Sequence, residues 1–206
     1  MTLSRRVFIV SGAIAAAGAR VASATTPVAG DMSLGPRDAR VHLIEYASLT
    51  CGGCAAFHAH VFPRLKSSYI DTGRIGFTFR EYPTPPAPVA FAMFQLARAG
   101  QADAATYFDR VAILFTRQPQ ILGPGTAAAA RDVMIAIGAE WGLSAEQVLN
   151  TIQDPAGAAR VQATVTDGRD RYGVTRTPSL ILNEGLLTGP PTYEALAAEL
   201  DRALAT

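Results

Sequence analysis

The stretch Val41-His-Leu-Ile-Glu-Tyr-Ala-Ser-Leu-Thr-Cys51-Gly-Gly-Cys54 contains the only two cysteines of the chain. Its first six residues predict a short, mostly apolar β-strand, and the apolar side chains of residues 55–68 recur every three or four positions, as in an amphipathic helix. Cys51 therefore begins a helix that follows a strand, where unpaired N–H groups and the helix dipole stabilise a thiolate. Such a position lowers a cysteine pKa from about 8.5 to roughly 3.5–7.5. Two intervening residues let the second thiol close back on the first, so the stretch predicts redox chemistry.

The first two dozen residues predict an export signal. Ser4-Arg-Arg-Val-Phe8 is basic, residues 8–19 are apolar, and Ala22-Ser-Ala24 is a small-x-small cleavage site. The apolar stretch is far shorter than the roughly 20 residues that span a bilayer, which favours a cleaved signal over an anchor. The arginine pair resembles the twin-arginine export signal, and an ordinary secretory signal is the alternative. Both routes lead to the bacterial cell envelope, and we expect a periplasmic protein cleaved near Ala24.

The charge of the mature chain is nearly balanced. The whole sequence has 18 basic and 17 acidic residues, and the expected signal contains three of the arginines and no acidic residue. Its removal leaves 15 basic against 17 acidic residues, which argues against nucleic acid or a membrane surface as a partner. The 182 residues that remain fit one domain, or one domain with an insertion.

The expected elements follow the order of an α/β fold. After the strand at 41–46 and its helix, residues 75–82 predict a second strand, which pairs in parallel with the first across the connecting helix. Residues 87–172 show helical periodicity and no convincing strand. Ser179-Leu-Ile-Leu-Asn183 predicts a third strand, and it is followed by a Glu184-Gly185 turn, a short fourth strand and a closing helix. The mature chain is thus expected to divide into residues 25–86, 87–172 and 173–206.

Three motifs together resemble a known family. They are Glu45-Tyr-Ala-Ser-Leu-Thr-Cys51-Gly-Gly-Cys54, Phe79-Arg-Glu-Tyr-Pro83 and Gly173-Val-Thr-Arg-Thr-Pro178. They are similar to those of exported DsbA-type thiol–disulfide oxidoreductases of the thioredoxin superfamily, over nearly all of the mature chain from Leu34 onward. The resemblance implies a thioredoxin-like α/β fold, built from the first and third segments, with the middle segment as an inserted helical domain.

The resemblance also implies roles for five residues. Cys51 is the exposed nucleophile, and Cys54 is the more buried thiol that resolves the mixed disulfide. Pro178 is a cis proline opposite the disulfide, and Thr177 before it pairs through its backbone with the bound peptide. Glu45 lies under the active site and aids proton transfer. No metal or organic cofactor is expected, because the two cysteines hold the electrons.

The dipeptide between the cysteines departs from the family pattern. Strongly oxidising members carry Pro-His there, and the histidine helps to hold the thiolate. Gly52-Gly53 offers no such side chain and has extra backbone freedom to lose. Because stabilisation of the reduced thiolate makes such a disulfide oxidising, we expect a weaker oxidant here. The Cys51 pKa is expected nearer the roughly 7 of thioredoxin than the roughly 3.5 of DsbA.

Other readings of these residues stay open on the sequence alone. The cysteine pair could be a structural disulfide, although so small a loop restricts the unfolded chain little. Cys54 and His58 share a helix face, so a thiol-based metal carrier is conceivable; otherwise His58 and His60 are ordinary, partly exposed helix residues. Glu45 can relay protons if it is partly buried, or it can pair with Arg80.

The sequence therefore predicts a periplasmic thiol–disulfide oxidoreductase that acts on exported proteins with free thiols or disulfides. A dithiol oxidase is the first expectation, with a membrane redox partner that resets Cys51 and Cys54. Isomerase or reductase work is the alternative within the same chemistry, because it needs only a different partner to reset the pair.

Overall fold

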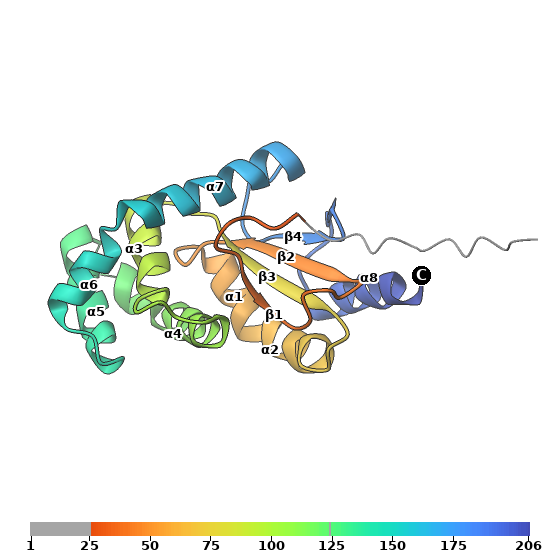
Figure 1. Ribbon diagram of the computed structural model, residues 1–206, viewed down its shortest axis with the longest axis horizontal. Coiled ribbons are helices and arrows are strands. Elements are labelled where there is room, and N and C mark those ends of the chain that lie inside the picture. Colours follow the sequence, from red (N-terminus) through yellow and green to blue (C-terminus); the bar gives the residue numbers. More distant parts are fainter. Residues whose placement is uncertain (1–25, 124) are drawn as a thin grey trace, which may run out of the picture.

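A five-stranded mixed sheet lies at the centre of the molecule (Figure 1). The computed structural model describes residues 26–123 and 125–206, so the signal peptide expected over residues 1–24 lies outside it. The strand order is β1-β3-β2-β4-β5; β2 and β3 are parallel, and the other neighbours are antiparallel. The strands are β1 Met32–Leu34, β2 His42–Ala47, β3 Gly76–Glu81, β4 Ser179–Leu182 and β5 Gly185–Leu186.

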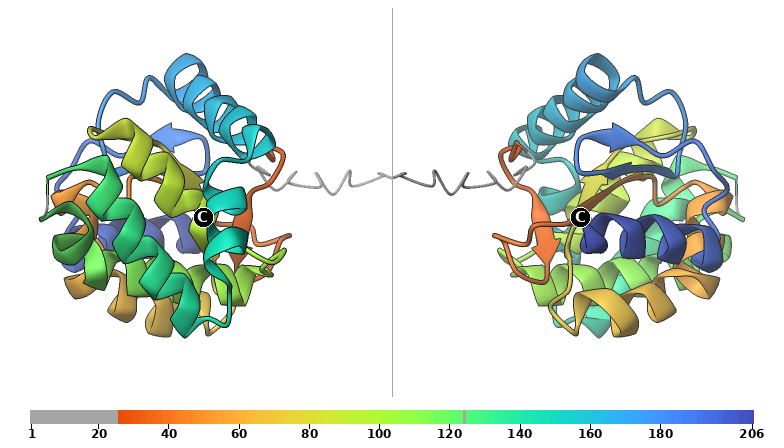
Figure 2. Two further views of the ribbon diagram at one scale, coloured as in Figure 1. Left: turned by 90° about the vertical axis from the view of Figure 1, so that its left-hand side faces the viewer. Right: turned by 90° about the vertical axis from the view of Figure 1, so that its right-hand side faces the viewer.

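Helices connect the strands and cover the sheet. The helices are α1 Gly52–His60, α2 Phe62–Leu65, the π-helical η1 Lys66–Ile70, α3 Ala87–Ala97, α4 Ala104–Leu122, α5 Ala127–Glu140, α6 Ala145–Ile152, α7 Pro155–Tyr172 and α8 Tyr193–Ala205. Helices α3 to α6 gather at one end of the sheet, and α7 runs back along one side of it (Figures 1 and 2). This is the predicted thioredoxin-like fold with a helical insertion between β3 and β4. Within the described ranges no helix has the length and apolar character needed to cross a membrane.

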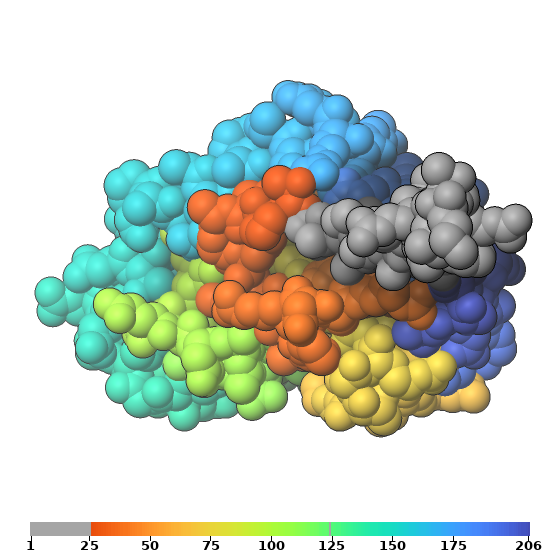
Figure 3. Space-filling model, turned by 45° about the vertical axis from the view of Figure 1, so that its right-hand side comes forward, coloured from red at the N-terminus to blue at the C-terminus, as the bar shows by residue number. Residues whose placement is uncertain are grey.

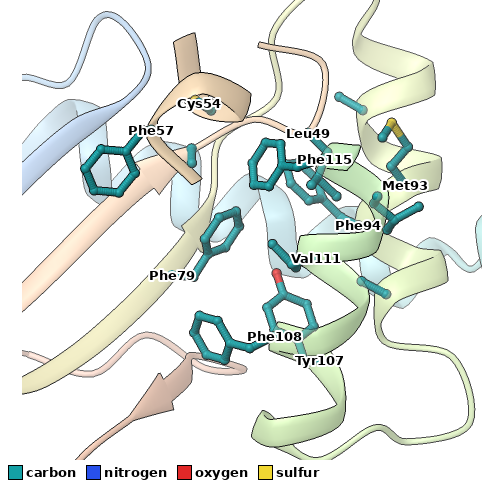
Figure 4. Packing of buried hydrophobic residues seen from close by; sticks show 14 of the residues in the cluster. Leu49, Cys54, Phe57, Phe79, Met93, Phe94, Tyr107, Phe108, Val111 and Phe115 are labelled. Atoms are coloured by element: carbon teal, nitrogen blue, oxygen red, sulfur yellow. The ribbon is translucent and has the colours of Figure 1, made fainter. Parts of the chain in front are cut away.

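The two faces of the sheet belong to different clusters. Leu43 and Phe77 lie in the large core shared with α1, α2, α8 and the insert, part of which Figure 4 shows. Ile44 and Tyr46 belong to a smaller cluster that also contains Tyr172 of α7. Because successive side chains of a strand point to opposite faces, the residue between Ile44 and Tyr46 projects into the large core beneath α1.

The segment after the cysteines is broken, although the sequence predicts one helix over 55–68. Helix α1 ends at His60, α2 follows, and a π-helical turn completes the connection to β3. Pro63 stands in the first turn of α2. Proline has no N–H to donate to the preceding turn of a continuous helix, which accounts for the break at Val61.

Other boundaries also differ from the sequence prediction. Strand β1, only three residues long, lies within residues 25–40, where the prolines and glycines of the sequence predict an extended lead-in to the first strand. The periodicity of the sequence indicates a helix from Ala102 to Thr116, whereas α4 continues past Pro119 to Leu122. Its last turns are anchored by buried residues, including Gln118 and Ile121. The turn between β4 and β5 is formed by Asn183 and Glu184, both with positive φ, and not by Glu184 and Gly185.

A buried arginine, Arg80, joins the segment before β2 to the sheet and to α7, so the alternative in which Arg80 pairs with Glu45 is not the one that the structure adopts. The Arg80 side chain is 1% exposed. It donates to Asp31 at 2.9 and 3.0 Å, to Asp167 of α7 at 2.6 Å and to the Tyr46 hydroxyl at 2.8 Å. It projects from the opposite face of the sheet, so it cannot reach Glu45. Figure 3 shows the lead-in lying on the surface beside α7.

Replacement of Arg80 by methionine is expected to lower the free energy of unfolding by about 3–5 kcal/mol, because it leaves two poorly exposed carboxylates without their cation. Urea unfolding measures this change. Arg169→Met is the matched control: that arginine also pairs with an aspartate, but on the exposed surface of α7, where such pairs add little. Equal urea midpoints for the two variants would show that Arg80 does not stabilise the fold as the buried cation of Asp31 and Asp167.

Candidate redox site

The two cysteines occupy the first turn of α1, directly after the loop that follows β2. Cys51 is the N-cap residue of the helix, with φ −87° and ψ 121°, and its sulfur accepts a hydrogen bond from the Cys54 N–H at 3.4 Å. The Cys51 thiol is half-buried and also lies 3.4 Å from the carbonyl oxygen of Thr177. Both cysteines are free thiols. The first cysteine thus begins the helix, as the strand–turn–helix pattern predicts.

The Cys51 pKa is lowered by its hydrogen bonds. The Cys54 thiol has the largest effect, and backbone N–H groups of Cys54 and Gly53 add to it; together they bring the Cys51 pKa to about 5 despite partial burial. This pKa lies between the roughly 7 of thioredoxin and the roughly 3.5 of DsbA. The sequence argument considered the missing histidine side chain, whereas in the structure the second thiol and the backbone donors face the sulfur directly.

The environment of Cys54 raises the pKa of its thiol. Its side chain is fully buried, with the Ser48 N–H 3.5 Å from the sulfur. Burial raises the Cys54 pKa most, and the hydrogen bond with Cys51 and the charge of Glu45 raise it further. Figure 4 shows Cys54 on the inner side of α1, above the aromatic core. Two thiols one helical turn apart are therefore held at very different pKa values, which is how one site obtains an acidic and a non-acidic member of a pair.

The loop before β4 brings Thr177 and Pro178 against the cysteine turn. The Thr177–Pro178 peptide bond is cis. A Cβ placed on Gly53 would lie 3.4 Å from the Pro178 ring and 3.6 Å from the Cys51 sulfur. Both are ordinary van der Waals distances, so the loop and the cysteine turn lie in close contact at Gly53. Gly52 has open space around its Cα, so the two glycines are not equivalent.

A groove of about 610 Å³ starts at this loop and continues toward the edge of the sheet. It is bounded by the segment 173–180, the segment 186–191 and the first turns of α8. The groove contains Thr177 and Pro178 and also Leu186, which is exposed on the edge strand β5. The groove therefore begins beside the Cys51 sulfur and leads along the chain segments that border β4 and β5.

Glu45 and His58 form a buried pair beneath α1. Glu45 is 0% exposed, and its Oε2 lies 2.9 Å from Nε2 of His58, whose side chain is 4% exposed. His58 is therefore not the partly exposed residue that the sequence indicates; Phe62 and Phe115 pack against its ring. His60 is exposed, as expected. The amphipathic pattern missed His58 because a histidine on an apolar helix face is read as polar unless its partner is known.

The arrangement does not bring metal ligands together. Among the residues that the structure describes, no three His, Cys, Asp or Glu side chains form a group that could hold a metal ion. The Nε2 atom of His58 faces Glu45, so the helix face that it shares with Cys54 does not present a histidine–thiol pair.

Gln118 is a site residue that the sequence did not reveal. It lies on α4 of the insert and is buried, and its amide nitrogen donates to the carbonyl oxygens of Leu49 at 2.8 Å and Cys51 at 3.2 Å. The insert thus holds the backbone of the cysteine turn directly. No local signal marks this residue, because its partners lie 67 and 69 positions earlier in the chain.

Comparison with known proteins identifies the family. Residues 28–202 match the thioredoxin family. The chain belongs to this family. A protein of Rickettsia conorii that is provisionally named a protein-disulfide oxidoreductase is 28% identical to this thioredoxin-family protein over 174 residues. The matched region is 84% of this chain but only 60% of the Rickettsia protein, so the chain spans less than two thirds of that relative's length.

Solved structures share the fold of this thioredoxin-family protein. Wolbachia pipientis α-DsbA1 superposes with a TM-score of 0.78 at 22% identity, over 89% of this chain and 96% of that one. A structure described as a protein-disulfide isomerase from Novosphingobium aromaticivorans gives a TM-score of 0.75 at 20% identity, over 86% and 98% of the two chains. The fold is therefore that of DsbA proteins, a thioredoxin-like sheet with a helical insertion.

Proposed function

We propose that this protein is a periplasmic thiol–disulfide oxidoreductase that introduces disulfides into exported proteins through Cys51 and Cys54. The observation that carries the proposal is the contrast between the two thiols. Cys51 is half-exposed with a pKa lowered to about 5, whereas Cys54 is buried with a raised pKa. One sulfur can therefore meet a substrate as a thiolate while the other is withheld as a thiol.

In the oxidising direction, the reaction starts from the Cys51–Cys54 disulfide. A substrate thiolate attacks the Cys51 sulfur, and the bond to Cys54 breaks, so that Cys54 leaves with the electron pair and takes up a proton. A second substrate thiolate then attacks the substrate sulfur of the mixed disulfide and displaces Cys51 as a thiolate. The substrate loses two electrons, and the cysteine pair gains them. Cys51 is a good leaving group because its thiolate is stable at neutral pH.

Glu45 is the proposed proton donor and acceptor for Cys54. It is buried beneath α1, and its charge contributes to the raised pKa of Cys54, so the two groups interact. Its Oε1 atom is buried and has no hydrogen-bond partner among the described residues. A carboxylate oxygen in that position can exchange a proton with the buried thiol when the Cys51–Cys54 bond forms or breaks.

An extended segment of the substrate is proposed to bind beside Thr177. The Thr177 carbonyl lies next to the Cys51 sulfur, and the groove that begins at Thr177 and Pro178 leads away along the sheet edge. A substrate strand can add to this backbone by β-augmentation, in which main-chain hydrogen bonds give affinity with little dependence on sequence. Such binding suits partly unfolded exported chains.

The oxidase direction is favoured over isomerase or reductase work by the low Cys51 pKa, since a stable thiolate favours the reduced form of the pair. Turnover then needs an oxidant for the reduced pair, and a membrane redox partner in the cell envelope is proposed for this step. The signal expected over residues 1–24 would deliver the protein to that compartment, where disulfides persist.

We expect the purified protein to catalyse oxidation of a dithiol peptide by glutathione disulfide. Equilibration of the Cys51–Cys54 pair with glutathione should give a potential between the roughly −270 mV of thioredoxin and the roughly −120 mV of DsbA. A potential below that of thioredoxin would instead support a reductase. Faster recovery of a scrambled protein than of a reduced one would support an isomerase, and stoichiometric metal retained after purification would support a thiol-based carrier.

A further inference from the structure

The Glu45 carboxylate is enclosed by apolar groups and one imidazole. On the sheet, Glu45 lies opposite Phe79 of β3 and Leu180 of β4. Among its described neighbours, His58 is the hydrogen-bond partner of Oε2, at 2.9 Å, and Oε1 has none. A buried carboxylate that loses its hydrogen bonds is strongly disfavoured. Loss of the His58 imidazole would therefore leave the Glu45 carboxylate without its hydrogen-bond partner.

Apart from its contact with Glu45, the His58 ring is packed among aromatic side chains that do not titrate. Phe115 of α4 stacks on it with ring centroids 4.4 Å apart, and Phe62 of α2 lies 4.6 Å away. Phe57 of α1 and Phe79 of β3 approach it edge-on. The titratable groups of this region are Glu45 on β2 and Cys54, one turn before His58 on α1. This packing aims Nε2 at Glu45 and leaves the ring little freedom to turn.

We propose that His58 is a positioning residue for proton transfer at Cys54, which holds Glu45 through Oε2 so that Oε1 exchanges the proton. This inference rests on the proposed function. When the mixed disulfide on Cys51 is resolved, the Cys54 thiol gives its proton to Oε1 of Glu45. The Cys54 sulfur then forms a bond to the Cys51 sulfur, and the substrate sulfur leaves with the electron pair of the broken bond. In the opposite direction, Oε1 returns the proton to Cys54.

Attack by Cys51 and resolution of the mixed disulfide by Cys54 can be measured separately with reduced full-length protein and 5,5′-dithiobis(2-nitrobenzoate). Cys51 releases the first thionitrobenzoate, and attack by Cys54 on the mixed disulfide releases the second. In His58→Phe, which keeps an aromatic ring in the stack, the first release should be unchanged. The second should slow at least about tenfold, a modest part of the 10²–10⁴ that general acid–base catalysis contributes. Its pH dependence should also shift.

Three further variants make the test specific. His58→Gln keeps an N–H donor and should restore most of the second release and its pH profile. Glu45→Gln removes the proton acceptor and should slow the second release at least as much as His58→Phe. His60→Phe, an exposed change on the same helix, should behave like the wild type. If His58→Phe loses the first release as well, the smaller His58→Leu provides the same comparison in its place.

Each outcome has a defined meaning. A normal second release and pH profile in His58→Phe, together with a slow one in Glu45→Gln, would overturn the role of His58 and leave the proposed function intact. Normal behaviour of both variants would overturn the relay through Glu45 as well. Absence of a second release in the wild type would show that Cys54 does not resolve mixed disulfides, which would remove the proposed function itself.

Discussion

Replacement of Cys51 by serine is expected to abolish disulfide exchange. The Cys51 sulfur is the half-exposed one, and it lies beside the Thr177 carbonyl, where a substrate strand can bind. A serine hydroxyl remains protonated at neutral pH and cannot form a disulfide, so no mixed disulfide can be made at this position. The assay is oxidation of a dithiol peptide in the presence of glutathione disulfide, and the expected rate equals the uncatalysed background.

Replacement of Cys54 by alanine should block resolution of the mixed disulfide and not the attack that forms it. The Cys51 thiolate is retained, so attack on a disulfide still occurs, but no second sulfur is present to displace the substrate. Mixed disulfides with substrate should therefore accumulate and be visible as a mass increase that a reductant reverses. Cys51→Ser is the matched control, because it keeps one cysteine but should trap nothing. Trapping by Cys51→Ser in place of Cys54→Ala would reverse the two roles.

The fold could be predicted largely from the sequence because its central strands are plainly marked. Residues 41–46 are mostly apolar, and apolar side chains recur at alternate positions from Ile75 to Phe79. These stretches form β2 and β3, the two central strands, which are buried along their whole length. The short and interrupted elements of the fold could not be predicted in the same way. A three-residue strand such as β1 gives too little pattern to detect, and the break at Val61 depends on a single proline within an otherwise regular helical pattern.

The site could be predicted only where its residues are close together in the chain or carry a family motif. Cys51 and Cys54 are placed by the strand–turn–helix pattern, and the resemblance brings Thr177 and Pro178 to them. His58 and Gln118 have no such mark. Their functions depend on contacts between elements: one pairs with a strand beneath its helix, and the other reaches from the insert to the cysteine turn.

The pKa of Cys51 could also be inferred only from the structure. From the sequence, the Gly52-Gly53 dipeptide suggests weak stabilisation of the thiolate. In the folded protein, the donors that face the Cys51 sulfur are the Cys54 thiol and backbone N–H groups, which any dipeptide compatible with the turn could supply. A pKa depends on the atoms around the sulfur, and side-chain identity in the dipeptide is one contribution among several.

Alkylation of each single thiol against pH should therefore separate the two cysteines by a large factor. The thiolate is the reactive form, so the rate for Cys51 should be low below pH 5, rise through a midpoint near its pKa of about 5 and level off above it. The pKa of Cys54 is raised by burial, by Cys51 and by Glu45, so its rate should still be rising at pH 9. At pH 7 nearly all of Cys51 is a thiolate and well under about 1% of Cys54 is, so Cys51 should react at least about 100-fold faster.

The measurement uses reduced wild-type protein, with the modified cysteine located by mass spectrometry, because the Cys54 thiol is itself the main cause of the low Cys51 pKa. In Cys54→Ala that hydrogen bond is lost and the backbone donors remain. The midpoint for Cys51 should then move upward from about 5 while staying below the ordinary thiol value. An unchanged midpoint would mean that the backbone N–H groups and the helix terminus alone hold the thiolate, and faster labelling of Cys54 would overturn the assignment of the nucleophile.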